Sequence, residues 1–269
     1  MWSALAVLTA ASGTMPPFQL SAICFLIGSL IGLTAMARDP KRFRAFRQPA
    51  KVWALGLFGL FGYHFLYFTA LRNAPAVEAG LIAYLWPLLI VVGSALLPGE
   101  RLGWHHVAGA LMGLAGTALI LMRGAEGGFG GGSLLGYAAA GLCALTWSGY
   151  SLMSRRFAGF CIISAVLSAL CHVFLETTVW PETAGQWLAV IGLGLGPVGL
   201  AFYAWDFGVK KGDIQVLGVA SYAAPLLSTL ILILFGHGKA SIGIAVACLL
   251  ITGGAFLAAK DLLKGRKSA

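Results

Sequence analysis

Long apolar runs dominate this sequence and most constrain its fold. Breaks at glycine, proline and clustered charge separate ten such runs, at residues 1–13, 17–36, 51–71, 76–97, 104–122, 133–154, 159–179, 185–207, 214–236 and 240–259. About 20 apolar residues in a helix cross the hydrocarbon core of a bilayer, and a helix bonds its own backbone groups there. The runs predict an all-α membrane protein with ten transmembrane helices in a lipid bilayer. The first run is too short to span about 30 Å, so we expect residues before it in the natural protein.

Charge is sparse and is placed at the ends of the apolar runs. Only 10% of the 269 residues are charged, whereas a soluble domain averages about 25%. The net charge of +9 could suit nucleic acid, but the basic residues lie in the gaps between apolar runs, as in membrane topology. The five cysteines lie within apolar runs and have no metal-ligand spacing. We therefore expect no nucleic-acid partner, no metal and no cofactor.

The distribution of lysine and arginine predicts the orientation. If the N-terminus is cytoplasmic, all but three of the 18 basic residues fall in cytoplasmic gaps or in the C-terminal tail; the exceptions are Arg72, Arg123 and Lys239. Cytoplasmic loops of membrane proteins carry this excess. Both termini are therefore predicted to be cytoplasmic.

One motif occurs twice. Tyr-x-x-Pro-Leu-Leu begins at Tyr84 and again at Tyr222, 138 positions later. The same register pairs Gly80 with Gly218, Pro87 with Pro225 and Gly116 with Gly254. A second match lies elsewhere: Trp2-Ser3 recurs as Trp147-Ser148. We therefore predict two five-helix copies, at residues 1–128 and 129–269.

An odd number of spans in each copy has a structural consequence. The second copy must enter the membrane from the opposite side, which gives an inverted-topology repeat with a substrate site near the bilayer midplane. Pro87 and Pro225 each remove a backbone donor in mid-membrane. We interpret them as hinges for alternate opening to the two sides; the other interpretation is the packing irregularity that proline commonly causes in membrane helices.

These features together resemble the drug/metabolite transporter superfamily in its EamA branch: ten helices as five plus five, an early Trp-Ser, "PGERL" after the fourth run and a basic tail. Tyr-Leu-Trp-Pro at 84–87 and Gly-Tyr-His-Phe-Leu-Tyr at 62–67 are similar to bacterial YddG-type exporters of aromatic amino acids. The resemblance implies a secondary transporter of the bacterial inner membrane that exports Phe, Tyr and Trp by alternating access through a central aromatic cavity. One departure is Gly238-Lys239, which stands where the first copy has Glu100-Arg101.

Polar aromatic residues within the runs are the candidate substrate-binding residues. A Tyr, Trp or His that faces lipid would leave a polar group unpaired, at a cost of several kcal/mol, so such residues are expected to face the interior. The set is His64, Tyr67, Tyr84, Trp86, Trp147, Tyr150, Tyr203 and Tyr222. They suit a flat, apolar ligand with one polar end, although ordinary helix packing would also use them.

Other functions are weakly supported. Multidrug exporters driven by protons usually need a midplane carboxylate, whereas Glu78, Glu176 and Asp206 are placed near the ends of their runs. The chain has no P-loop and no His/Asp/Glu constellation that would suit a membrane enzyme. An exporter of the same fold for another amino acid, metabolite or drug remains an alternative. We expect the transporter to act as a monomer.

The orientation can be tested directly. A reporter that is active only in the cytoplasm should be active when fused after Ala269, and a cysteine introduced at Gly127 should react with an impermeant reagent from outside. Labelling of that cysteine only from the cytoplasm would contradict five spans per copy.

Overall fold

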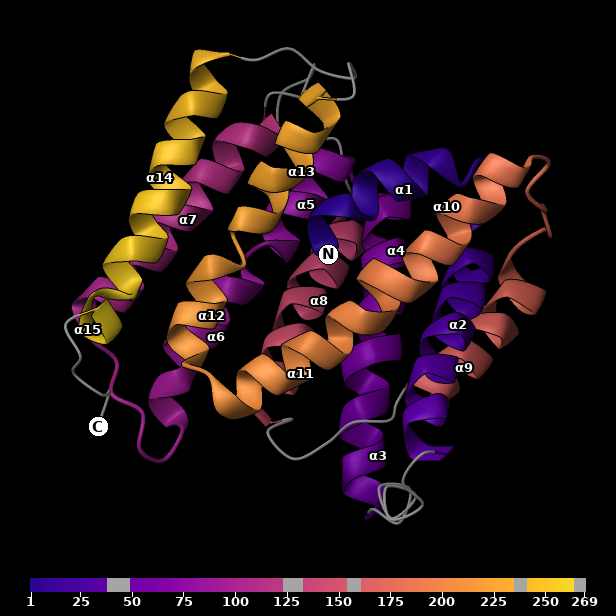
Figure 1. The fold of residues 1–269 in the computed structure, drawn as a ribbon, viewed down its shortest axis with the longest axis horizontal. Coiled ribbons are helices and arrows are strands. Elements are labelled where there is room, and N and C mark those ends of the chain that lie inside the picture. The colour runs from indigo at the N-terminus through magenta and orange to yellow at the C-terminus, as the bar shows by residue number, and fades with distance from the viewer. Residues whose placement is uncertain (38–48, 123–132, 154–160, 235–240, 264–269) are drawn as a thin grey trace. The chain divides into compact units, whose positions relative to one another are not determined.

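The computed structural model describes residues 1–37, 49–122, 133–153, 161–234 and 241–263, and within them all regular structure is helical (Figure 1). Six helical stretches of the described chain are long and apolar enough to cross a membrane: Pro17–Thr34, Ala50–Asn73, Glu78–Leu96, Trp104–Met122, Ala184–Lys211 and Ile214–Ile231. The prediction of an all-α, multi-pass membrane protein is confirmed at this level. Arg123, Gly127, Arg155, Arg156 and Lys239 lie outside the described residues, as does the tail from Lys264.

The chain divides into two compact units, and each unit takes segments from both predicted copies. The first unit comprises Met1–Phe61 and Ser154–Phe207, and the second comprises Gly62–Met153 and Gly208–Ala269. Helices of the first unit are α1 (Leu5–Ala11, after a 3₁₀ turn at Trp2–Ala4), α2 (Pro17–Ala37), α3 (Ala50–Leu57), α9 (Cys161–Leu175), α10 (Ala184–Leu195) and most of α11 (Ala201–Lys211). Helices of the second unit are α4 (Tyr63–Asn73), α5 (Ala76–Ala83), α6 (Trp86–Gly93), α7 (Trp104–Met122), α8 (Leu134–Met153), α12 (Ile214–Ala220), α13 (Ala223–Leu234), α14 (Ile242–Ala258) and α15 (Lys260–Leu263).

Two long spans each contain a π-helical turn. One lies at Phe58–Gly62 between α3 and α4, and the other lies at Gly196–Leu200 between α10 and α11. Their first residues are 138 positions apart, which is the offset between Tyr84 and Tyr222. Such turns are rare and frequently occur at functional sites. The two spans are therefore irregular at matching positions.

The two spans with the repeated motif are interrupted just before their prolines. Between α5 and α6 the N–H of Leu85 donates to the carbonyl of Ile82 at 3.1 Å, a tightened turn. Pro87 lacks the N–H that would have bonded Ala83 and continued α5 into α6. Between α12 and α13 the N–H of Tyr222 makes the same type of bond to Val219, at 3.1 Å. Pro87 and Pro225 thus stand in the first turn of a new helix, where a missing N–H is tolerated.

Helices α7 and α14 lie side by side in the second unit (Figure 1). A Cβ at Gly109 would lie 2.5 Å from the carbonyl oxygen of Gly254, and a Cβ at Gly116 would lie 3.0 Å from that of Ala247. Residue numbers therefore rise along one helix and fall along the other, so the pair is antiparallel. Small residues allow this close backbone approach, as is common in membranes.

Helices α2 and α9 are joined in the first unit through Glu176. Its buried carboxylate accepts from the N–H groups of Phe18 and Gln19 at 3.1 Å, at the start of α2, and contacts His172 at 3.1 Å. A negative charge is favourable at a helix N-terminus. The start of α2 thus meets the end of α9, so this pair is antiparallel too. Of the helix predicted at 159–179, the structure describes α9 at Cys161–Leu175, and residues 176–179 are not helical.

The α7–α14 contact yields a stability prediction. Gly109→Ala would place a methyl group against a backbone oxygen, and such overpacking costs roughly 1–3 kcal/mol. Gly141→Ala on α8 is the control, since its Cβ would meet no atom within 4 Å. The thermal unfolding midpoint in detergent should fall for Gly109→Ala and hold for Gly141→Ala. Equal midpoints for the two variants would contradict a close α7–α14 contact.

Candidate substrate site

Trp147, on α8, is the central residue of an aromatic cluster in the second unit. Its ring centroid lies 5.3 Å from Tyr63, 5.5 Å from Tyr150 and 6.2 Å from Trp86, which it meets edge-on at 86°. Trp147 is 3% exposed, and Trp86 and Tyr150 are both 7% exposed. Three helices, α4, α6 and α8, therefore bring their rings to one place.

Further aromatic side chains of α4 extend the cluster. Tyr63 and Tyr67 are four residues apart, on one face of the helix, and their rings are nearly parallel with centroids 6.1 Å apart. The ring of His64 lies 5.2 Å from that of Tyr63 and 6.1 Å from that of Phe68. Tyr63, His64, Tyr67 and Phe68 are all partly exposed. Phenol and imidazole side chains of α4 therefore lie beside the buried indole of Trp147.

Five of the eight predicted residues, His64, Tyr67, Trp86, Trp147 and Tyr150, are thus brought together. Sequence reasoning missed Tyr63, although this residue links Trp147 to His64 and Tyr67. A usable signal was present: Tyr63 begins the Tyr-His-Phe-Leu-Tyr stretch at i,i+4 spacing from Tyr67.

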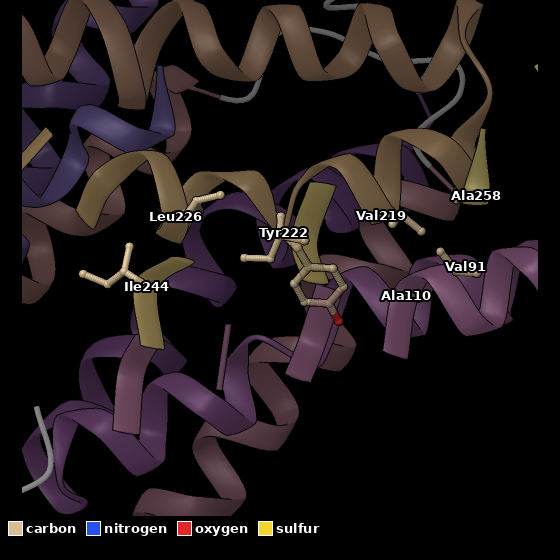
Figure 2. Packing of buried hydrophobic residues seen from close by; sticks show 8 residues of the cluster. Val91, Ala110, Val219, Tyr222, Leu226, Ile244 and Ala258 are labelled. Atoms are coloured by element: carbon tan, nitrogen blue, oxygen red, sulfur yellow. The ribbon is translucent and has the colours of Figure 1, made fainter. Parts of the chain in front are cut away.

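Tyr84 and Tyr222 lie at the helix breaks and pack in a core cluster. Figure 2 shows Tyr222 among Val219, Leu226 and Ala110. Tyr222 has no exposed surface, and a Cβ at Gly113 would overlap its ring. Tyr84 packs against the same cluster but is only partly buried.

Tyr203 lies in the first unit, on α11, where its hydroxyl donates to the carbonyl of Gly28 at 3.2 Å. The first unit has an aromatic cluster of its own: the ring of Trp2 lies 5.2 Å from Trp205 and 6.1 Å from Phe202. The indole N–H of Trp2 donates to the carbonyl of Pro197, in the π-helical turn, at 3.1 Å. Tyr203 is therefore the one predicted site residue that lies outside the second unit.

Comparison of the two clusters shows a difference in polarity. The 138-residue offset pairs His64 with Phe202 and Tyr67 with Trp205. The second unit therefore presents imidazole and phenol groups where the first presents a benzyl and an indole side chain. Of these two clusters, the one around Trp147 brings phenol and imidazole groups next to buried indoles. It suits a ligand with an aromatic body and a polar end.

Other chemistry is limited in the part of the chain that the structure describes. No group of three or more His, Cys, Asp or Glu there could hold a metal ion. All five cysteines are free thiols; Cys24, Cys143 and Cys161 are buried, and the other two are half-buried. The buried carboxylate of Glu78, in the first turn of α5, accepts from the hydroxyl of Tyr137 on α8. This bond ties α8 to α5.

Known proteins resemble the chain over nearly its whole length. The model of the EamA-like transporter family matches residues 1–122. "Aromatic amino acid exporter YddG" of Ancylobacter novellus is 54% identical over 96% of this chain and 93% of its own, and the protein of that name from Escherichia coli is 26% identical over 70% and 68%. A solved crystal structure that is 53% identical covers 98% of this chain and 95% of its own, with a TM-score of 0.90.

Proposed function

We propose that this chain, which belongs to the EamA-like transporter family, exports aromatic amino acids across the bacterial inner membrane by alternating access. One observation supports aromatic amino acids as the substrate class: the cluster around Trp147 places buried indoles next to phenol and imidazole groups. The 54% identity to an aromatic amino acid exporter supports it. Family membership makes the protein a transporter and not an enzyme.

The cluster offers an aromatic amino acid two kinds of contact. Edge-to-face and offset ring pairs contribute about 0.5–1.5 kcal/mol beyond the burial of apolar area. Trp86 and Trp147 are candidates to hold the substrate ring, and Tyr63, His64 and Tyr67 to bond its amino and carboxylate groups. Tyr150 supports Trp147 from within α8. Tyr84 and Tyr222, at the helix breaks, and Tyr203, on α11, are also proposed as substrate-binding residues, on the strength of their polar aromatic side chains within the apolar spans.

The proposed architecture has ten transmembrane helices as two inverted copies, 1–128 and 129–269, with both termini in the cytoplasm. Corresponding helices of such copies must run in opposite directions. The pairs α7–α14 and α2–α9 join corresponding spans and are antiparallel, and the π-helical turns share the offset of the tyrosines. These facts support the repeat. A single chain would then form the whole substrate path, so we propose a monomer.

Pro87 and Pro225 are proposed to be hinges. Each follows an interruption that leaves two short helices in place of one long helix, and the interruptions stand at corresponding positions. Rotation at such a point disturbs few intrahelical hydrogen bonds, because the linking bond is already missing. An exporter of the same fold for another amino acid or amphipathic metabolite is the alternative.

The substrate class is tested by counterflow in reconstituted vesicles, with Phe, Tyr, Trp and aliphatic amino acids. Trp86→Ala removes a ring pair and apolar contact at about 25 cal/mol per Å². Since 1.4 kcal/mol is a factor of ten, uptake of aromatic substrates should weaken roughly tenfold or more, and aliphatic uptake less. Trp187→Ala, on the partly exposed face of α10, should change neither.

Two results would oppose this assignment. If wild-type protein exchanges no aromatic amino acid, the proposed substrate is wrong. If Trp86→Ala slows aromatic and aliphatic substrates by the same factor at normal expression, Trp86 holds helices together and does not select the substrate.

The hinges are tested by replacing Pro87 and Pro225 with Ala, singly and together. The new N–H groups allow α5 to join α6 and α12 to join α13 as continuous helices. The double variant should insert normally and transport more slowly than the product of the two single effects. Pro181→Ala, outside the described helices, is the control. Wild-type rates in the double variant would leave both prolines with a packing role alone.

A further inference from the structure

Ser148 directly follows Trp147 on α8, and its hydroxyl lies within hydrogen-bond distance of two backbone carbonyls. Its side chain is buried, at 4% exposure. The hydroxyl lies 3.0 Å from the carbonyl oxygen of Trp86 and 2.6 Å from that of Ala144. The Ala144 contact is the local bond to residue i−4 that serine makes in many helices. The Trp86 contact is different, because it crosses from α8 to α6.

The place of this second contact connects it with substrate recognition. Trp86 is the first residue of α6, directly after the break at Tyr84 and Leu85. Its indole meets the ring of Trp147, and its carbonyl meets the hydroxyl of Ser148. Two neighbouring residues of α8 thus contact one residue of α6 through its side chain and its backbone at once.

The bonding of this span changes just before the contact. The N–H of Leu85 bonds Ile82 in a tightened turn, and Pro87 supplies no N–H to Ala83, so fewer backbone bonds join the first turn of α6 to α5 than in a regular helix. A backbone-to-side-chain bond restricts both the distance and the rotation of that turn. The ring contact alone would leave the edge-to-face angle of 86° free to change.

We infer that Ser148 is a positioning residue that determines specificity: its hydroxyl fixes the first turn of α6 against α8 and so sets the angle between Trp86 and Trp147 for an aromatic substrate. This inference rests on the proposed function. The carbonyl of Ala144 offers the same proton a second acceptor. Helix α6 can therefore leave α8 during transport without an unpaired hydroxyl remaining buried, and such an unpaired group would oppose the movement.

The test compares Ser148→Ala with Ser148→Thr, which retains the hydroxyl, in the counterflow assay. The loss of one buried hydrogen bond should raise the KM for Phe and Trp roughly three- to tenfold. The KM for an aliphatic substrate should change less, so the ratio of aromatic to aliphatic uptake falls. Ser148→Thr should restore that ratio toward the wild-type value. Ser151→Ala, a buried serine one turn further along α8, is the matched control and should keep the wild-type ratio.

The outcomes separate the two hypotheses. If wild-type protein exchanges aromatic amino acids and Ser148→Ala keeps the wild-type ratio, the inference on Ser148 is wrong and the proposed function stands. If wild-type protein exchanges none, both fail. If Ser148→Ala does not reach the membrane, Ser148→Cys keeps a weak donor of similar size and should give an intermediate ratio; an unchanged ratio there also overturns the inference.

Discussion

The need to bond every backbone polar group away from water governs this structure. In lipid an unpaired carbonyl or N–H costs several kcal/mol, so the backbone groups of an irregular turn must find partners within the protein. Two side-chain bonds to irregular segments come from the repeated Trp-Ser dipeptide. Trp2 donates to the carbonyl of Pro197 in a π-helical turn, and Ser148 donates to the carbonyl of Trp86 beside a helix break. One Trp-Ser pair thus adds a bond to the π-helical turn at Gly196–Leu200, and the other adds a bond to the first turn of α6.

Much of the fold follows from the sequence, because its strongest signals are local. Apolar runs predicted the helices, and Tyr-x-x-Pro predicted where two spans weaken, since proline removes a specific hydrogen bond. The π-helical turns at Phe58–Gly62 and Gly196–Leu200 were not predicted. One contains a proline and the other does not, although each contains two glycines three residues apart. Glycine is common in membrane helices, so this pattern alone does not predict a π-helical turn, and the shared offset becomes visible once the backbone is known.

The candidate site could be predicted in part, and the failures have identifiable causes. The repeat register suggests equal roles for Tyr84 and Tyr222, but their surroundings differ. Tyr222 fills the space over Gly113, whereas the position that corresponds to Gly113 in the second copy is Ile251, itself buried in the core. A tyrosine cannot enter the equivalent space there, and Tyr84 is only partly buried. Pattern matching within one span does not show which neighbour is small enough to accept a ring.

The two copies also differ in the polarity of their aromatic side chains. A perfectly symmetric repeat would offer an amino acid two equal sites, and the polar end of the ligand would have no preferred direction. At the corresponding positions the second copy has Phe202 in place of His64 and Trp205 in place of Tyr67, so the polar groups of the two copies are not equivalent. The helix breaks before Pro87 and Pro225 and the glycines at 116 and 254 occur in both copies. The two copies therefore differ more in the aromatic side chains of these clusters than in the position of the helix breaks.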